Sequence, residues 1–121
     1  MTTVLLVGSG AVGRRAARQL AESDVVERIL ITDRVATAAD ESAQAMGERA
    51  EAIDWAPDRP LPAGVDVVAS AIGGAAERAV FERALEAGVP AAGCADDADT
   101  VRSLLDLDDA AREAGVTLAA G

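Results

Sequence analysis

The sequence predicts an α/β fold built on a doubly wound parallel sheet, with about six strands in the order 3-2-1-4-5-6. Three observations predict this fold. Apolar segments with β propensity alternate with helical segments, a glycine-rich turn follows the first apolar segment, and an acidic residue ends the second. Because 121 residues is the length of a single domain with a real core, we expect one domain that spans residues 1–121.

The first half of the chain supplies three predicted strands and two predicted helices. The apolar run 3–7 predicts the first strand, and the Ala, Leu, Arg and Gln composition after it predicts a helix over 12–22. A second apolar run predicts a strand over 28–33. The alternation continues with a helix over 37–46 and a short strand over 51–54.

The second half begins with segment 55–62, which holds three of the four prolines and predicts a loop where this fold often has a helix. The alternation then resumes. The expected strands are 65–71, 89–93 and 116–119, and the expected helices are 75–87 and 97–114. Right-handed crossovers between parallel strands place the ligand crevice at the carboxyl ends of the first and fourth strands.

The glycine-rich turn reads Gly8-Ser-Gly10-Ala-Val-Gly13, which is the spacing of a dinucleotide-binding fingerprint. Gly8 allows a sharp turn, Gly10 has no Cβ that would hold a pyrophosphate away from the backbone, and Gly13 allows the helix to lie close to the strand. The phosphates would bind the free N–H groups and positive dipole end of the helix N-terminus. The turn, in this strand–turn–helix context, predicts a Rossmann-type nucleotide site.

Asp33 ends the second predicted strand, about 20 residues beyond Gly13, where the fingerprint places a carboxylate for the adenosine ribose hydroxyls. A solvated carboxylate at a strand end is the alternative interpretation. The choice of cofactor depends on Asp33 and Arg34 together. The carboxylate would repel the 2′-phosphate of NADP, whereas the guanidinium could bind that phosphate or stack on adenine. NAD is favoured over NADP on this balance.

Two further groups lie near the predicted crevice. The run Ala71-Ile72-Gly73-Gly74 follows the fourth predicted strand, and its small side chains would leave room for the nicotinamide or its ribose. An ordinary strand-to-helix turn explains the run equally well. Asp54, which ends the third predicted strand, is either a neighbour of the adenine amino group or a solvated carboxylate.

Neither the cysteine nor the acidic cluster predicts chemistry. Cys94 lies just past the fifth predicted strand, with nothing beside it in the sequence that would lower a thiol pKa, so we expect a partly buried residue without a chemical role. Asp96, Asp97 and Asp99 precede a predicted helix, which favours N-capping over metal binding. No metal site is expected.

The composition excludes some partners. Because the net charge is −10 and no basic patch offsets it, nucleic acid and anionic membranes would repel the chain. No segment is apolar enough to span a membrane, and the chain enters its first strand without a secretion signal, so we expect a cytoplasmic location. The single cysteine agrees with a reducing compartment. Homo-oligomerisation is left open.

The chain contains no His, Lys or Tyr, the side chains that most often move protons beside a nicotinamide. Only carboxylates and one thiol remain, and no sequence context assigns a catalytic role to any of them. We therefore expect a cofactor-binding part of an enzyme, whose catalytic residues and substrate pocket belong to another domain.

A series of blocks in a fixed order extends beyond the fingerprint. The blocks are Gly8 to Gly13, Asp33-Arg34, Asp66 to Gly73, Ala79 to Pro90, Ala95 to Asp97 and Glu113 to Leu118. With these blocks the sequence resembles the N-terminal cofactor domain of the saccharopine dehydrogenase family over nearly its whole length. In that family the domain binds NAD or NADP and is followed by a second domain that completes the substrate site. The resemblance thus implies that residues 1–121 are the N-terminal part of a longer protein.

The resemblance also implies roles for individual residues. It implies pyrophosphate contacts from Gly8, Gly10, Ala11, Val12 and Gly13, adenosine ribose contacts from Asp33 and Arg34, and positions along the nicotinamide for Ala71, Ile72 and Gly73. One departure matters: many relatives have an aromatic residue and an Asp or Ser where this chain reads Ala91-Ala-Gly-Cys94. The family also contains members whose substrate is not saccharopine, so the resemblance names no substrate.

The leading hypothesis is the nicotinamide-dinucleotide-binding domain of a saccharopine dehydrogenase-like oxidoreductase, in which hydride transfer occurs only in the full-length protein. A regulatory nucleotide-sensing module of a transporter or channel is the alternative, because it uses the same fingerprint and needs no catalytic side chain. A scaffold that has lost its nucleotide is a third possibility, which the intact glycines oppose.

Overall fold

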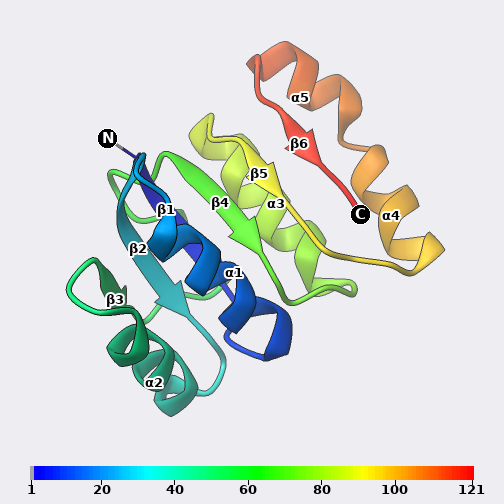
Figure 1. The fold of residues 1–121 in the computed structure, drawn as a ribbon. Coiled ribbons are helices and arrows are strands. Elements are labelled where there is room, and N and C mark those ends of the chain that lie inside the picture. The colour runs from blue at the N-terminus through cyan, green and yellow to red at the C-terminus, as the bar shows by residue number, and fades with distance from the viewer. Residues whose placement is uncertain (1) are drawn as a thin grey trace.

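A six-stranded sheet runs through the computed structural model, which describes residues 2–121 (Figure 1). All neighbouring strands are parallel, in the order β3-β2-β1-β4-β5-β6. The strands are β1 (Thr2–Val7), β2 (Val26–Thr32), β3 (Ala50–Ala52), β4 (Val67–Ser70), β5 (Ala91–Ala92) and β6 (Leu118–Ala119). The helices are α1 (Ala11–Glu22), α2 (Ala36–Met46), α3 (Ala76–Ala87), α4 (Ala98–Leu105) and α5 (Asp108–Ala114). The predicted doubly wound Rossmann topology is confirmed.

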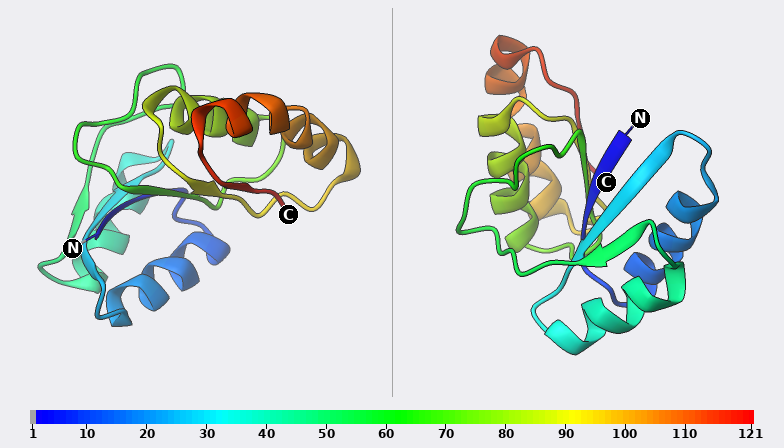
Figure 2. Two further views of the ribbon diagram at one scale, coloured as in Figure 1. Left: turned by 90° about the horizontal axis from the view of Figure 1, so that it is seen from above. Right: turned by 90° about the vertical axis from the view of Figure 1, so that its left-hand side faces the viewer.

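Helices cover both faces of the sheet (Figure 2), and the buried strands are apolar for that reason. Along β1, Val4 and Leu6 face the side of α1 and α2, whereas Leu5 and Val7 face the side of α3, α4 and α5. Leu5 pairs with Leu30 of β2, and both side chains belong to the apolar cluster on the side of α3, α4 and α5. Within residues 2–121, no helix is long and apolar enough to cross a membrane.

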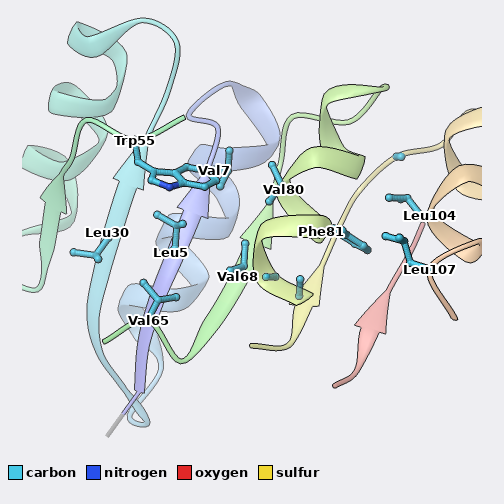
Figure 3. Close-up of a cluster of buried hydrophobic side chains, with 13 residues drawn as sticks. Leu5, Val7, Leu30, Trp55, Val65, Val68, Val80, Phe81, Leu104 and Leu107 are labelled. Carbon is cyan, nitrogen blue, oxygen red and sulfur yellow. The ribbon is translucent and has the colours of Figure 1, made fainter. Parts of the chain in front are cut away.

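The connection from β3 to β4 contains no helix, as the prolines predict. Trp55 takes the place of a helix by covering the ends of β1 and β2, where it packs near Val7 (Figure 3). The Thr32 hydroxyl donates a hydrogen bond to the Trp55 carbonyl at 2.6 Å, and the indole N–H donates to the Pro60 carbonyl at 2.9 Å. The first bond holds the loop at the carboxyl end of the sheet, and the second lies within the loop.

The single helix predicted over 97–114 is wrong, because the structure has α4 and α5 instead. The chain tightens between them, where the N–H of Leu107 bonds to the carbonyl of Leu104 at 3.1 Å. This three-residue spacing turns both leucines toward Phe81 (Figure 3). Asp108 and Asp109 then lie in the first turn of α5, where the helix dipole favours acidic residues. The later strands are also shorter than predicted, while their order is unchanged.

Phe81 is fully buried between the sheet and α4, so it tests this core. Phe81→Ala should lower the free energy of unfolding by about 3–5 kcal/mol, because it removes a large side chain and leaves a cavity. Leu105→Ala is the control, since Leu105 is 61% exposed, and it should change stability by about 0.5 kcal/mol or less. Urea unfolding measures both; equal losses would contradict the packing described.

Candidate functional site

A cleft of about 630 Å³ opens at the carboxyl ends of β1, β2 and β4, where the sequence predicts the ligand crevice. Most of the predicted site residues meet there, although they come from four separate segments of the chain. Its walls include Gly8, Gly10, Asp33, Arg34, Asp54, Trp55, Ala71, Ile72, Gly73 and Gly74. Ala11, Val12 and Gly13 are not in the wall but form the first turn of α1 immediately behind it.

The glycine turn has the geometry that its spacing predicts. Gly8 has φ +105°, a backbone conformation that favours glycine. A Cβ at Gly13 would lie 2.6 Å from the carbonyl carbon of Gly8 and closer still to its oxygen, so the start of α1 touches the end of β1. A Cβ at Gly10 would meet no protein atom within 4 Å. Packing therefore explains Gly13, whereas the open space beside Gly10 fits a group from outside the chain.

The first turn of α1 supplies hydrogen-bond donors to that space. The N–H of Arg14 is bonded to the Gly10 carbonyl at 2.9 Å, and the amides before it precede the helical hydrogen-bond ladder. Gly10 offers no side-chain cap, and the turn contains no acidic residue. Free amides, a positive dipole end and room for close approach together fit a phosphate group.

Asp33 is held rigidly at the end of β2. Its Oδ2 accepts hydrogen bonds from the Ser9 N–H at 2.8 Å and the Ser9 hydroxyl at 3.0 Å, and its Oδ1 accepts from the Val35 N–H at 2.9 Å. Burial raises the pKa of the Asp33 carboxyl, but these hydrogen bonds and the charge of Arg34 outweigh it, so the pKa lies below its usual value. The carboxylate is thus ionised and fixed beside the glycine turn.

Asp54 also reaches the cleft, but its carboxylate faces water. The side chain is 97% exposed and forms an ion pair with Arg59 at 3.2 Å. Of the two interpretations of Asp54 made from the sequence, this geometry favours the solvated carboxylate.

The end of the cleft beside β4 is lined by backbone and small side chains. Gly73 and Gly74 follow each other with φ +62° and φ +63°, so the chain makes a tight left-handed turn before α3. Ile72 is 40% exposed beside them. A Cβ at Gly8 would lie 3.0 Å from the Cγ2 atom of Ile72, so the two loops press against each other. This end carries no charged side chain in the cleft wall.

Glu77 is the residue that reasoning from the sequence missed. It lies in the first turn of α3, where an acidic residue usually faces water and is stabilised by the helix dipole, yet its side chain is fully buried. Its carboxylate accepts hydrogen bonds from the N–H groups of Cys94 at 3.3 Å and Ala95 at 3.0 Å. Burial and the Glu77 charge raise the pKa of the Cys94 thiol, which keeps it protonated at neutral pH.

The acidic cluster before α4 acts as a cap. The Asp97 side chain accepts a hydrogen bond from the Thr100 N–H at 2.9 Å, which confirms the N-cap predicted for this cluster. Hydrogen bonding from Thr100 lowers the pKa of the Asp97 carboxyl. In residues 2–121, no group of three or more potential metal ligands comes together.

The sequence from residue 4 to residue 119 matches the family model of the saccharopine dehydrogenase NADP binding domain. The chain belongs to this family. Its cofactor is accordingly a nicotinamide dinucleotide. Membership favours the cofactor-domain hypothesis over a regulatory module of a transporter or channel.

Solved structures of oxidoreductases share the fold. Apo saccharopine dehydrogenase from Saccharomyces cerevisiae has a TM-score of 0.77 and 22% identity, with 99% of this chain and 27% of that one covered. GenD2 from gentamicin A biosynthesis, in complex with NAD, has a TM-score of 0.80 and 24% identity, with 99% and 34% covered. Biliverdin reductase from Synechocystis sp. PCC 6803, with biliverdin and NADP⁺, has a TM-score of 0.83 and 21% identity, with 98% and 37% covered.

This chain therefore spans between 27% and 37% of the length of these three proteins. No curated protein sequence matches it significantly.

Gly13 and Gly10 separate the packing role of the turn from its ligand role. Gly13→Ala should lower the free energy of unfolding by about 1–3 kcal/mol, because the new Cβ overlaps with the Gly8 carbonyl. Gly10→Ala should leave stability within about 1 kcal/mol, because its φ of −74° suits alanine and its Cβ points into open space. Thermal unfolding without nucleotide distinguishes them, and equal destabilisation would contradict this geometry.

The Asp33 hydrogen bonds also predict a pH dependence. A carboxyl whose pKa is lower in the folded state binds fewer protons there, so it stabilises the fold above the unfolded-chain pKa of about 3.9. The stability difference between the wild type and Asp33→Asn should be constant above about pH 5 and shrink as pH falls through the folded pKa. Urea unfolding at a series of pH values measures it; a difference that grows on acidification would contradict the assigned hydrogen bonds.

Proposed function

We propose that this chain is the cofactor domain of a saccharopine dehydrogenase-like oxidoreductase, that it binds NAD in preference to NADP, and that a second domain of a longer protein completes the reaction. The observation that carries the proposal is the Asp33 carboxylate, fixed by Ser9 and Val35 at the cleft wall beside the glycine turn. A dinucleotide that lies across the carboxyl ends of the strands would meet this carboxylate with its adenosine ribose.

The proposed cofactor contacts follow the cleft from one end to the other. The pyrophosphate would lie over the start of α1, the adenosine ribose at the end of β2, and the nicotinamide beside β4. The contact residues are Gly8, Gly10, Ala11, Val12 and Gly13 for the pyrophosphate, Asp33 and Arg34 for the ribose, and Ala71, Ile72 and Gly73 for the nicotinamide. Support comes from the free amides of the first helical turn and the space beside Gly10.

The preference for NAD rests on electrostatics at the end of β2. Both oxygens of Asp33 already accept hydrogen bonds from the protein, so the carboxylate cannot swing away from a ribose without losing them. A 2′-phosphate would add about two negative charges close to this fixed charge. Arg34 attracts that phosphate and also compensates part of the Asp33 charge, and both effects reduce the repulsion. We therefore expect NADPH to bind more weakly than NADH rather than to be excluded.

Hydride transfer requires groups that the cleft does not supply. The carboxylates in its wall, Asp33 and Asp54, belong to the adenosine end, while the proposed nicotinamide end has backbone and small or aliphatic side chains. The thiol of Cys94 does not line the cleft. A proton donor or acceptor and a substrate site would therefore come from outside these residues, as a second domain would provide. We also propose a cytoplasmic location, since the single cysteine suits a reducing compartment.

Separate titrations with NADH and NADPH test the proposal. Trp55 is the only tryptophan and lies in the cleft wall, so energy transfer from its indole to the reduced nicotinamide reports binding at this site. NADH should bind more tightly than NADPH. Asp33→Ala should weaken NADH about tenfold or more, because a charged acceptor of ribose hydroxyl hydrogen bonds is lost, and should weaken NADPH less.

Asp40→Ala is a matched control, because Asp40 is an exposed carboxylate on α2 that does not line the cleft. It should change neither affinity by more than about twofold. An unchanged cofactor preference in Asp33→Ala would remove Asp33 from the site, and tighter binding of NADPH by the wild type would overturn the preference. No saturable binding of either nucleotide would contradict the proposed cofactor domain.

A further inference from the structure

Glu77 is a fully buried carboxylate whose partners are backbone amides rather than a cation. Its oxygens accept hydrogen bonds from Cys94 and Ala95, and within residues 2–121 it forms no ion pair. Burying an ionised carboxylate costs several kcal/mol unless hydrogen bonds compensate it. An apolar side chain would fill the same volume without that cost. The role of Glu77 is therefore to hold the backbone of Cys94 and Ala95 in place through its hydrogen bonds.

The contact between Glu77 and Gly93 shows how closely the carboxylate fits. A Cβ at Gly93 would lie 2.6 Å from the Cδ atom of Glu77 and nearer still to one of its oxygens. The φ of Gly93 is not positive, so backbone conformation does not require glycine at this position. The chain passes directly over the carboxylate there, so a side chain at position 93 would force the Glu77 carboxylate to shift.

The two segments joined by Glu77 lie at the same edge of the sheet (Figure 1). Segment 71–75 connects β4 to α3 and lines the cleft, and segment 93–95 follows β5, the neighbouring strand. The backbone N–H of Glu77 itself donates a hydrogen bond to the Gly74 carbonyl at 3.1 Å. The carboxylate therefore ties the loop after β5 to the back of the loop that forms the cleft wall beside β4.

We propose that Glu77 is a positioning residue that sets the shape of the nicotinamide end of the cleft by holding segment 93–95 against the Gly73-Gly74 turn. The inference rests on the proposed function, because it takes the end beside β4 as the nicotinamide end. Glu77 does not touch the cofactor. It acts through Cys94 and Ala95, whose amides it binds.

Glu77→Gln tests this role, because the variant keeps the shape of the side chain and replaces one acceptor oxygen by an NH₂ group that opposes the amide N–H it faces. Two ligands separate the ends of the cleft: NADH occupies both, and ADP-ribose lacks the nicotinamide. By calorimetry, NADH affinity should fall about tenfold, while ADP-ribose affinity should stay within about twofold. Glu86→Gln, at an exposed position on α3, is the control and should change neither affinity.

The outcomes separate the two proposals. If the wild type binds neither ligand, the proposed function fails. If the wild type binds both and Glu77→Gln weakens them equally, or weakens neither, the cofactor site stands and the positioning role is overturned. Glu77→Asp, which keeps the charge but shortens the side chain, should give an intermediate loss of NADH affinity.

Two measurements do not depend on the folding of Glu77→Gln. In the unmodified protein, the amide protons of Cys94 and Ala95 should exchange slowly with solvent although both residues lie outside β5 and α4. Exchange at the rate of free loop amides would overturn the proposal. Gly93→Ala should destabilise the wild type more than it destabilises Glu77→Ala, because the clash requires the carboxylate. Equal destabilisation in both backgrounds would likewise overturn it.

Discussion

The structure depends on the contact between the start of α1 and the end of β1. A Cβ at Gly13 would overlap with the carbonyl of Gly8, so the helix begins as close to the strand as two backbones allow. This contact directs the first-turn amides of α1 toward the space beside Gly10. Because β1 is central in the sheet, the same contact places those amides between the ends of β2 and β4. The proposed phosphate site is thus a consequence of backbone packing.

The two ends of the cleft are built by different means. At the end of β2, the charged Asp33 is fixed by three hydrogen bonds, two of them from Ser9 in the glycine turn, so the proposed ribose and pyrophosphate contacts share one rigid unit. At the end of β4, the wall is formed by glycines and by small or aliphatic side chains. There the charge is buried in Glu77 and acts on the backbone.

The sequence predicts the strand order, the glycine turn and Asp33 because each depends on local spacing. Hydrophobic alternation places the strands, and the distance from Gly13 to Asp33 follows from one strand–helix–strand unit. Features that depend on contacts between distant segments are not predicted. In the sequence, Glu77 looks like an ordinary acidic residue in the first turn of a helix, which would face water. It is buried because segment 93–95, which is distant in the sequence, folds over it. A glycine at position 93, directly after a strand, was the one available signal.

The sequence does not predict the break between α4 and α5, because the break also depends on contacts with distant segments. Residues 97–114 contain neither glycine nor proline, so helix propensity continues through them. The turn at Leu107 arises because Leu104 and Leu107 both pack against the core. The acidic pair Asp108 and Asp109 marks the new helix start, but an acidic pair is equally common on an exposed helix face.

The central claim is that backbone geometry at the start of α1 forms a dinucleotide site. A crystal structure of the chain with NADH tests it most directly. We expect the pyrophosphate oxygens within hydrogen-bond distance of the Ala11 and Val12 amides, over the open side of Gly10, and the adenosine ribose hydroxyls on Asp33. A dinucleotide bound elsewhere, or one whose pyrophosphate does not contact the first turn of α1, would contradict the claim.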